Sequence, residues 1–174
     1  MTNDVLNTIQ NRRSVKKFLP DSVPADIVDA IAQAGLYAAN GMGKQSPIIL
    51  EITDKSLRDR LSALNALYFP KEIADPFYGA PVVLVVLADK SVPTYLYDGS
   101  LAMGNLLLAA QSLGVGACWI HRAKQMFDSE EGKKILSELG VEGDYEGIGN
   151  CVLGYPDGEL RPAPEIKDNR LFKA

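Results

Sequence analysis

The chain has 174 residues, of which 47% are hydrophobic and 23% charged, and its formal net charge is −4. This length and composition suit one globular domain with a substantial buried core. The acidic balance argues against nucleic acid or an anionic membrane as the main partner. We find no signal peptide and no run of 18 apolar residues, so we expect a cytoplasmic protein that does not cross a membrane.

The two cysteines, Cys118 and Cys151, lie far apart in apolar runs and form no CxxC or zinc-ligand pattern. Free cysteine is among the most buried residue types. We therefore expect two reduced core thiols and no metal site.

Hydrophobic periodicity, together with proline and glycine positions, predicts helices and strands in no strict alternation. The fold class expected from this order is α+β. In chain order we expect a first helix ending near Asn11, a second from Pro24 to about Asn40-Gly41, a strand at 48–52, a helix at 55–67, a strand at 82–88, a helix from Tyr97 to Leu113, a strand at 115–120, a helix from Asp128 to Leu139 and a strand from Gly147 to Gly154.

Three of these segments predict more than their own secondary structure. The helix from Tyr97 to Leu113 is apolar nearly all round, which is typical of a helix buried in the core or between subunits. Asp128 and Glu131 have the spacing of a capping box, which would begin the following helix at Asp128. The proline-rich end, residues 155–174, is expected to run as an extended arm of the single domain 1–174.

Basic residues cluster between the first two helices, where Arg12, Arg13, Lys16 and Lys17 surround Ser14. Such a cluster is compatible with a solvated charged face. It also fits an anion site, because the arginine fork matches phosphate oxygens in pairs and a lysine adds a point charge. Nucleic-acid binding is a third interpretation, weakened because no basic or aromatic stripe accompanies the cluster.

Four segments, taken in order, resemble the nitroreductase family of FMN-dependent enzymes and cover almost the whole chain. The run R-R-S-V-K-K-F, from Arg12 to Phe18, looks like the family signature R-R-S-x-R-x-[FY]. The others are residues 38–47 (A-A-N-G-M-G-K-Q-S-P), similar to A-P-S-x-x-N-x-Q-P-W; residues 98–119, similar to the long central helix and following strand; and Gly154-Tyr155-Pro156 with Lys167 and Arg170 downstream, similar to the G-Y-P strand end and basic tail.

The resemblance implies a mainly antiparallel central sheet flanked by helices, in an intertwined homodimer with two FMN molecules at the subunit interface. The apolar helix would then lie in the dimer core, and the proline-rich arm would reach across the partner.

The resemblance also implies roles for individual residues. Arg12, Ser14 and Lys16 would hold the ribityl phosphate and the pyrimidine edge, with Lys16 or Arg13 stabilising charge at N1 and O2 of reduced flavin. Asn40, Gly41, Gly43 and Gln45 would approach the flavin of the other subunit. Trp119, Ile120, His121 and Arg122 would lie along the isoalloxazine ring with a backbone N–H near N5, and Lys167 or Arg170 would complete the phosphate clamp.

Some positions depart from the family pattern. Lys16 stands where arginine is frequent, which keeps the charge but loses the bidentate geometry. Asn40 replaces the usual serine, Gly43 the usual asparagine, and Ser46-Pro47 the Pro-Trp pair, so the side-chain contact at residue 43 is in doubt. His121, the only histidine, is compatible with a structural role or a flavin-side role, and Trp119 with a core position or flavin contact.

The expected activity is transfer of a hydride from NADH or NADPH through flavin N5 to nitroaromatic, quinone or similar electron-poor acceptors, by a ping-pong mechanism. Three alternatives remain at this point. They are a specialised flavoenzyme of the same fold (a dehalogenase, ene-reductase or azoline dehydrogenase), a non-catalytic flavin-binding protein, and a non-flavin module that binds phosphate ligands or nucleic acid.

Overall fold

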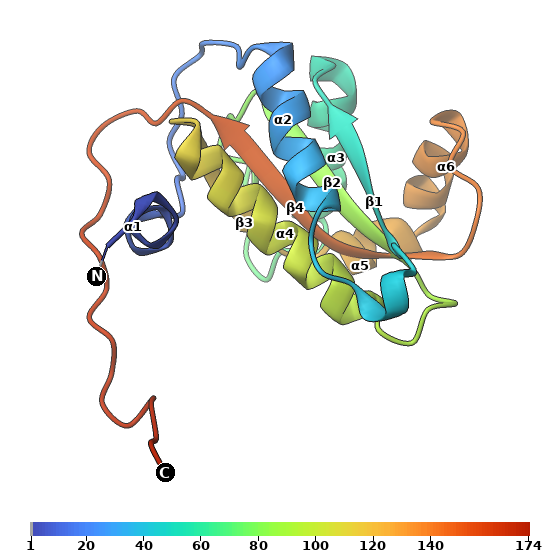
Figure 1. Cartoon of the computed structure of the whole chain (residues 1–174). Coiled ribbons are helices and arrows are strands. Elements are labelled where there is room, and N and C mark those ends of the chain that lie inside the picture. The colour runs from blue at the N-terminus through green and yellow to red at the C-terminus, as the bar shows by residue number, and fades with distance from the viewer. Residues whose placement is uncertain (1) are drawn as a thin grey trace.

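A four-stranded antiparallel sheet forms the centre of the computed structural model, which describes residues 2–174 (Figure 1). Its strands lie in the order β1-β2-β4-β3, so that β1 (Pro47–Ile52) and β3 (Gly116–Ile120) are the two edges. The central strands are β2 (Val82–Asp89) and β4 (Tyr145–Gly154). Seven of the eight residues of β2 are buried, because helices cover both faces of the sheet.

Two hydrophobic clusters lie on the two faces of the sheet, since successive side chains of a strand point to opposite sides. One cluster contains Leu84 and Val86 and packs against α2 (Ala25–Leu36) and α4 (Tyr95–Ser112). The other contains Val83 and Val85 and packs against helices from the opposite side, α3 (Lys55–Ala66), α5 (Ala123–Asp128) and α6 (Glu130–Glu138). The short helix α1 (Asp4–Asn11) lies beside α4.

The α+β class and the antiparallel sheet are confirmed, and most predicted elements lie within two residues of their expected bounds. The end of the second helix was predicted wrongly. Helix α2 ends at Leu36, and the chain continues through an extended Asn40 into the 3-10 turn Gly41–Gly43. The Asn40 side chain accepts a hydrogen bond from the Gln45 amide at 2.9 Å, so this asparagine favours the turn over the helix.

The capping-box prediction at Asp128 is also wrong. Asp128 is the last residue of α5, a helix that the sequence pattern did not predict. Ser129 is the N-cap of α6, and its hydroxyl accepts a hydrogen bond from the Gly132 amide at 3.0 Å. Serine and aspartate are both good N-caps, so the spacing alone did not distinguish two adjacent candidates.

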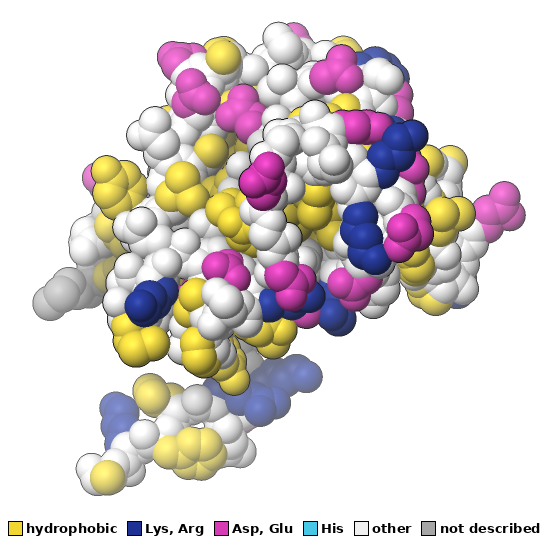
Figure 2. Space-filling model, turned by 90° about the vertical axis from the view of Figure 1, so that its right-hand side faces the viewer, with side chains coloured by type: hydrophobic (Ala, Val, Ile, Leu, Met, Phe, Trp, Pro, Cys, Tyr) yellow, Lys and Arg dark blue, Asp and Glu magenta, His cyan; other side chains and the backbone are white. Residues whose placement is uncertain are grey.

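Large apolar side chains remain exposed on several segments, among them α1, α4 and the arm. On α1 the stripe that predicted the helix is uncovered, with Val5 66% exposed, and on α4 Tyr97 is 73% exposed. The arm beyond Gly158 carries exposed Ile166, Leu171 and Phe172. Figure 2 shows the end of the chain standing clear of the body, with basic and hydrophobic side chains next to each other. Within residues 2–174 no helix is long and apolar enough to cross a membrane.

Candidate functional site

The basic run lies along the free edge of β3. Ser14 forms a parallel bridge with Ala117, and the Val15 amide donates to the Ala117 carbonyl at 3.0 Å. Val15 itself is buried, which fixes the segment against the sheet. An extended segment sends alternate side chains to opposite sides. The run therefore divides into two sets: Arg12, Ser14 and Lys16 on one side, and Arg13 and Lys17 on the other.

The second set is already occupied by contacts within the chain. The Arg13 guanidinium donates to the carbonyls of Gln10 at 2.8 Å and Arg161 at 3.0 Å. Lys17 pairs with Asp157 at 2.7 Å. These contacts fasten the end of α1 and the start of the arm to the sheet edge. The structure thus uses Arg13, one of the predicted cofactor residues, as a cross-link between backbone segments.

Arg12 is different, because one of its nitrogens is buried without a partner. Within residues 2–174 its Nη1 has no hydrogen-bond acceptor. Buried donors are nearly always paired, with protein, water or a bound ligand. The Ser14 hydroxyl and the Lys16 ammonium lie on the same side as Arg12, because side chains alternate along the extended segment that bridges Ala117. The unpaired Arg12 guanidinium nitrogen, the Lys16 ammonium and the Ser14 hydroxyl together form a candidate anion site.

Both cysteines are free and buried, as predicted. Burial raises the pKa of the Cys118 thiol, although Ser14, Lys16 and Arg12 act in the opposite direction. Complete burial raises the pKa of Cys151 as well. Both thiols are therefore protonated at neutral pH, and neither adds a negative charge to the candidate anion site.

The end of β3 supplies the next predicted residues. The indole of Trp119 lies against Gly149 of β4, where an added Cβ would come within 2.2 Å of the indole Nε1. Trp119 is 37% exposed, whereas Ile120 is buried and His121 exposed. Arg122 follows in a left-handed backbone conformation with φ 78°. Within residues 2–174 neither the His121 nor the Arg122 backbone N–H has a hydrogen-bond acceptor.

Aromatic side chains that sequence reasoning missed complete this edge. The Lys16 ammonium lies 5.5 Å from the centre of the Tyr78 ring, and the Arg122 guanidinium lies 4.3 Å from that of Phe69. Burial lowers the pKa of Arg122, with the Tyr78 hydroxyl acting in the opposite direction. Both aromatics belong to residues 67–80, which have no helical or strand periodicity. The sequence carried no signal that would place them here.

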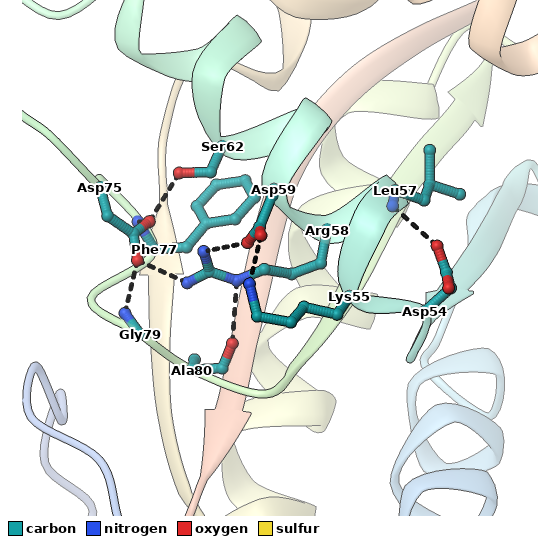
Figure 3. A network of polar contacts seen from close by, with 10 residues as sticks. All are labelled: Asp54, Lys55, Leu57, Arg58, Asp59, Ser62, Asp75, Phe77, Gly79 and Ala80. Atoms are coloured by element: carbon teal, nitrogen blue, oxygen red, sulfur yellow. Dashed lines mark hydrogen bonds and ion pairs between the residues drawn. The ribbon is translucent and has the colours of Figure 1, made fainter. Parts of the chain in front are cut away.

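A buried ion-pair network holds the segment with Tyr78 in place (Figure 3). Arg58 of α3 donates to the Ala80 carbonyl at 3.0 Å and to Asp75 at 2.7 Å. Asp75 also accepts from the Ser62 hydroxyl and from two backbone amides of the segment. Burial alone would raise the pKa of Asp75, but these hydrogen bonds keep it below its ordinary value.

A cavity of about 640 Å³ opens beside this network. Its charged lining residues pair with one another: Arg58 contacts Asp75 and Asp59, and Lys55 contacts Asp59. This volume therefore presents balanced charge. The cleft of about 320 Å³ at the basic run is lined by residues 13–17 and 156–161, so Arg13 and Lys17 line it together with Lys16, and Asp157 and Glu159 add negative charge.

The predicted residues 40–45 lie at the opposite edge of the sheet, in the turn that leads into β1. Asp98 of α4 anchors this turn from below, accepting from the Gly41 amide at 3.0 Å and from the hydroxyls of Ser46 at 2.7 Å and Thr94 at 3.0 Å. Burial alone would raise the pKa of Asp98, but these three hydrogen bonds keep it below its ordinary value. Gly43 has φ 64° and Gln45 φ 49°, and both are exposed.

The structure therefore does not bring all the predicted residues together within one chain. Two strands, β2 and β4, separate the turn at 40–45 from the basic edge at β3. Lys167 and Arg170 lie on the exposed arm, beyond its last hydrogen bond to the body at Arg161. A single chain brings together two groups of predicted residues at the β3 edge. They are Arg12, Ser14 and Lys16, and the residues from Trp119 to Arg122.

Fold and site together define an antiparallel α+β protein whose basic β3 edge, a candidate anion site, lies beside the turn that carries the exposed Trp119. The model of the Nitroreductase family matches residues 9–155. This chain belongs to that family.

Individual proteins similar to this chain carry the same family name. A protein of Methanothermobacter thermautotrophicus with the provisional name NADH dehydrogenase/NAD(P)H nitroreductase is 28% identical over 120 residues, 67% of this chain and 60% of that protein. A protein of Archaeoglobus fulgidus with the same name is 27% identical over 90% of this chain and 87% of its own length. The crystal structure of a Bacteroides fragilis nitroreductase with bound FMN is 29% identical, with a TM-score of 0.87 over 99% of this chain and 100% of that one.

Proposed function

We propose that this protein is an FMN-dependent oxidoreductase that passes a hydride from NADH or NADPH through flavin N5 to nitroaromatic, quinone or similar electron-poor acceptors, in ping-pong fashion. The observation that carries the proposal is the buried, unpaired Nη1 of Arg12 beside Ser14 and Lys16. A phosphate monoester brings about −1.5 to −2 charges and three acceptor oxygens, which suits this set of donors. The FMN bound to the Bacteroides fragilis relative supports the choice of ligand.

FMN, when bound, supplies the hydride and electron transfer chemistry. The chain supplies binding, orientation and charge. Arg12 and Ser14 bind the phosphate, and Lys16, beside Tyr78, stabilises negative charge at the pyrimidine edge. The free N–H groups of the His121–Arg122 turn provide donors for N5. Trp119 offers an exposed aromatic surface at the same edge.

The active form that we propose is a homodimer. The turn at 40–45, with Asn40, Gly41, Gly43 and Gln45, and the basic edge lie at opposite edges of one sheet, so a second copy is needed to bring one beside the other. The exposed apolar residues of α1, α4 and the arm provide area for such a contact, since large exposed patches mark interaction sites. In this proposal the arm, residues 155–174 of a single domain, crosses the partner and adds Lys167 or Arg170 to the phosphate clamp. A cytoplasmic location remains a prediction.

Anaerobic titration of the purified protein tests the proposal directly. The protein should take up FMN, become bleached by NADH or NADPH, and be reoxidised by a nitroaromatic or a quinone. Failure to bind FMN would exclude both flavin interpretations. FMN that neither nicotinamide bleaches would indicate a non-catalytic flavin protein, and reduced protein that the acceptor panel leaves unchanged would indicate a specialised flavoenzyme.

A further inference from the structure

Two asparagines with no exposed surface lie beneath the end of β3. Asn65 comes from α3 and Asn150 from β4, and both lie in a core that is otherwise largely apolar. A buried amide is destabilising unless hydrogen bonds compensate for its lost hydration. An apolar side chain would fill either position without that cost, so the partners of the two amides indicate what they do.

The partners are the last residue of β3 and the two residues that follow it, while the Oδ1 of Asn150 has no partner within residues 2–174. Asn150 donates from Nδ2 to the Ile120 carbonyl at 3.3 Å, and Asn65 donates from Nδ2 to the His121 carbonyl at 2.9 Å. The Oδ1 of Asn65 accepts from Nε and Nη2 of Arg122 at 3.1 and 3.0 Å. Residues 120, 121 and 122 are thus each held from the core, and Asn65 holds two of them. Both amides also approach the Met126 sulfur, at 3.0 and 3.5 Å.

This turn needs external support because of its backbone. Arg122 has φ 78°, a left-handed conformation in which any side chain with a Cβ is disfavoured. Residues in such conformations persist only when their surroundings hold them there. The two hydrogen bonds from Arg122 to Asn65, and the packing of its guanidinium on Phe69, provide that hold. The conformation leaves the His121 and Arg122 N–H groups without acceptors in residues 2–174.

We propose that Asn65, assisted by Asn150, is a positioning residue that locks the His121–Arg122 turn and keeps its backbone N–H donors aimed at the reacting edge of the cofactor. The inference rests on the proposed function for the identity of that cofactor. Asn65 touches neither cofactor nor substrate in this scheme. It acts through the turn, and its contribution should therefore appear in the flavin's reduction potential as well as in the mobility of the turn.

The test compares Asn65→Leu, which keeps the branching at Cγ but removes the hydrogen bonds, with wild type. Asn65→Ser, a smaller polar substitution, serves as a second variant should the leucine prevent folding. Ile31→Ala is the matched control, because Ile31 is fully buried in the other hydrophobic cluster and its truncation destabilises the fold without touching the turn. Two quantities are measured: hydrogen exchange of peptides covering residues 121–128 in the flavin-free full chain, and the midpoint potential of bound FMN.

The Asn65 variants should exchange about tenfold faster at the protected amides next to the turn, beginning with Met126, which donates to the Arg122 carbonyl at 3.0 Å, as expected for the loss of hydrogen bonds to a charged group. The midpoint potential should rise by about 30 mV, which for a two-electron couple is a tenfold change. The direction follows because an N–H donor stabilises the lone pair of oxidised N5 more than the N–H of reduced N5. Ile31→Ala should change neither quantity.

Unchanged exchange in both Asn65 variants would overturn the positioning role. Faster exchange with an unchanged potential, or equal effects from Ile31→Ala, would overturn its link to the cofactor. If wild-type protein binds no FMN, the proposed function fails separately, and the link to the cofactor fails with it. The exchange measurement on flavin-free protein would still decide whether Asn65 locks the turn.

Discussion

The β3 edge and the β1 edge of the sheet both carry residues predicted to contact the cofactor, but they are built differently. At β3, extended backbone presents Arg12, Ser14 and Lys16 together, and one guanidinium nitrogen is buried without a partner. At β1, the turn at 40–45 presents mainly backbone, and Asp98 holds it from the protein side. The comparison indicates that the β3 edge contributes charged side chains and the β1 edge contributes backbone groups, so that neither edge forms a complete site alone.

Removing residues 159–174 should have the largest effect on FMN affinity, because the arm is proposed to complete the phosphate clamp at the β3 edge. Loss of Lys167 and Arg170 with the arm should weaken FMN binding about tenfold to 100-fold, since the one charge-assisted contact proposed for the arm contributes about 1.5–3 kcal/mol. Quenching of flavin fluorescence measures the affinity. The double variant Lys167→Ala/Arg170→Ala separates charge from chain length, and full FMN affinity in the truncated chain would contradict a role for the arm.

Asp98→Ala tests the anchoring of the β1 edge. It leaves the Gly41 amide and the hydroxyls of Ser46 and Thr94 without their acceptor, and the free energy of unfolding should fall by about 2–4 kcal/mol. Urea unfolding measures the change. Asp98→Asn is the control, because it retains an acceptor oxygen for Gly41 and should cost about 1 kcal/mol. Equal losses in the two variants would show that the carboxylate contacts do not anchor the turn.

Arg12→Ala and Arg13→Ala form a matched pair at the β3 edge. Arg12→Ala should lower FMN affinity about tenfold or more, because it removes a charge-assisted contact. Arg13→Ala removes the same charge from a side chain that donates to the backbone carbonyls of Gln10 and Arg161, so the affinity should change by no more than about threefold. Isothermal titration with FMN measures both. Equal losses would mean that net charge, rather than the side of the extended segment, determines binding.

The pH dependence of the Asp98 contribution should be the smallest effect. The folded-state pKa of Asp98 lies below its unfolded value, so its carboxylate stabilises the fold fully above about pH 4 and less as pH falls through the folded pKa. The difference in unfolding free energy between wild type and Asp98→Asn should therefore be constant near neutrality and shrink in acid. A difference that grows on acidification would contradict the assigned hydrogen bonds.

The sequence predicted the scaffold better than the site, for physical reasons. The strands and long helices have strong periodicity, and the buried run of β2 could only be a central strand. The division of the basic run into Arg12, Ser14 and Lys16 against Arg13 and Lys17 depends on the bridge between Ser14 and Ala117, which local patterns do not encode. Phe69, Tyr78 and Asn65 reach the site through tertiary packing of α3 and the segment after it. The spacing of these three residues in the sequence does not predict that they lie near the β3 edge.

The place of β4 in the sheet has a consequence for biosynthesis. It is the last element of the chain, yet it lies between β2 and β3 and pairs with both. Before β4 is synthesised, the apolar strand β2 therefore has β1 as a neighbour but no strand on its other side, and β3 has no strand to pair with. Folding of the sheet must wait until β4 has been synthesised, and the risk of aggregation should be highest while β2 lacks this neighbour.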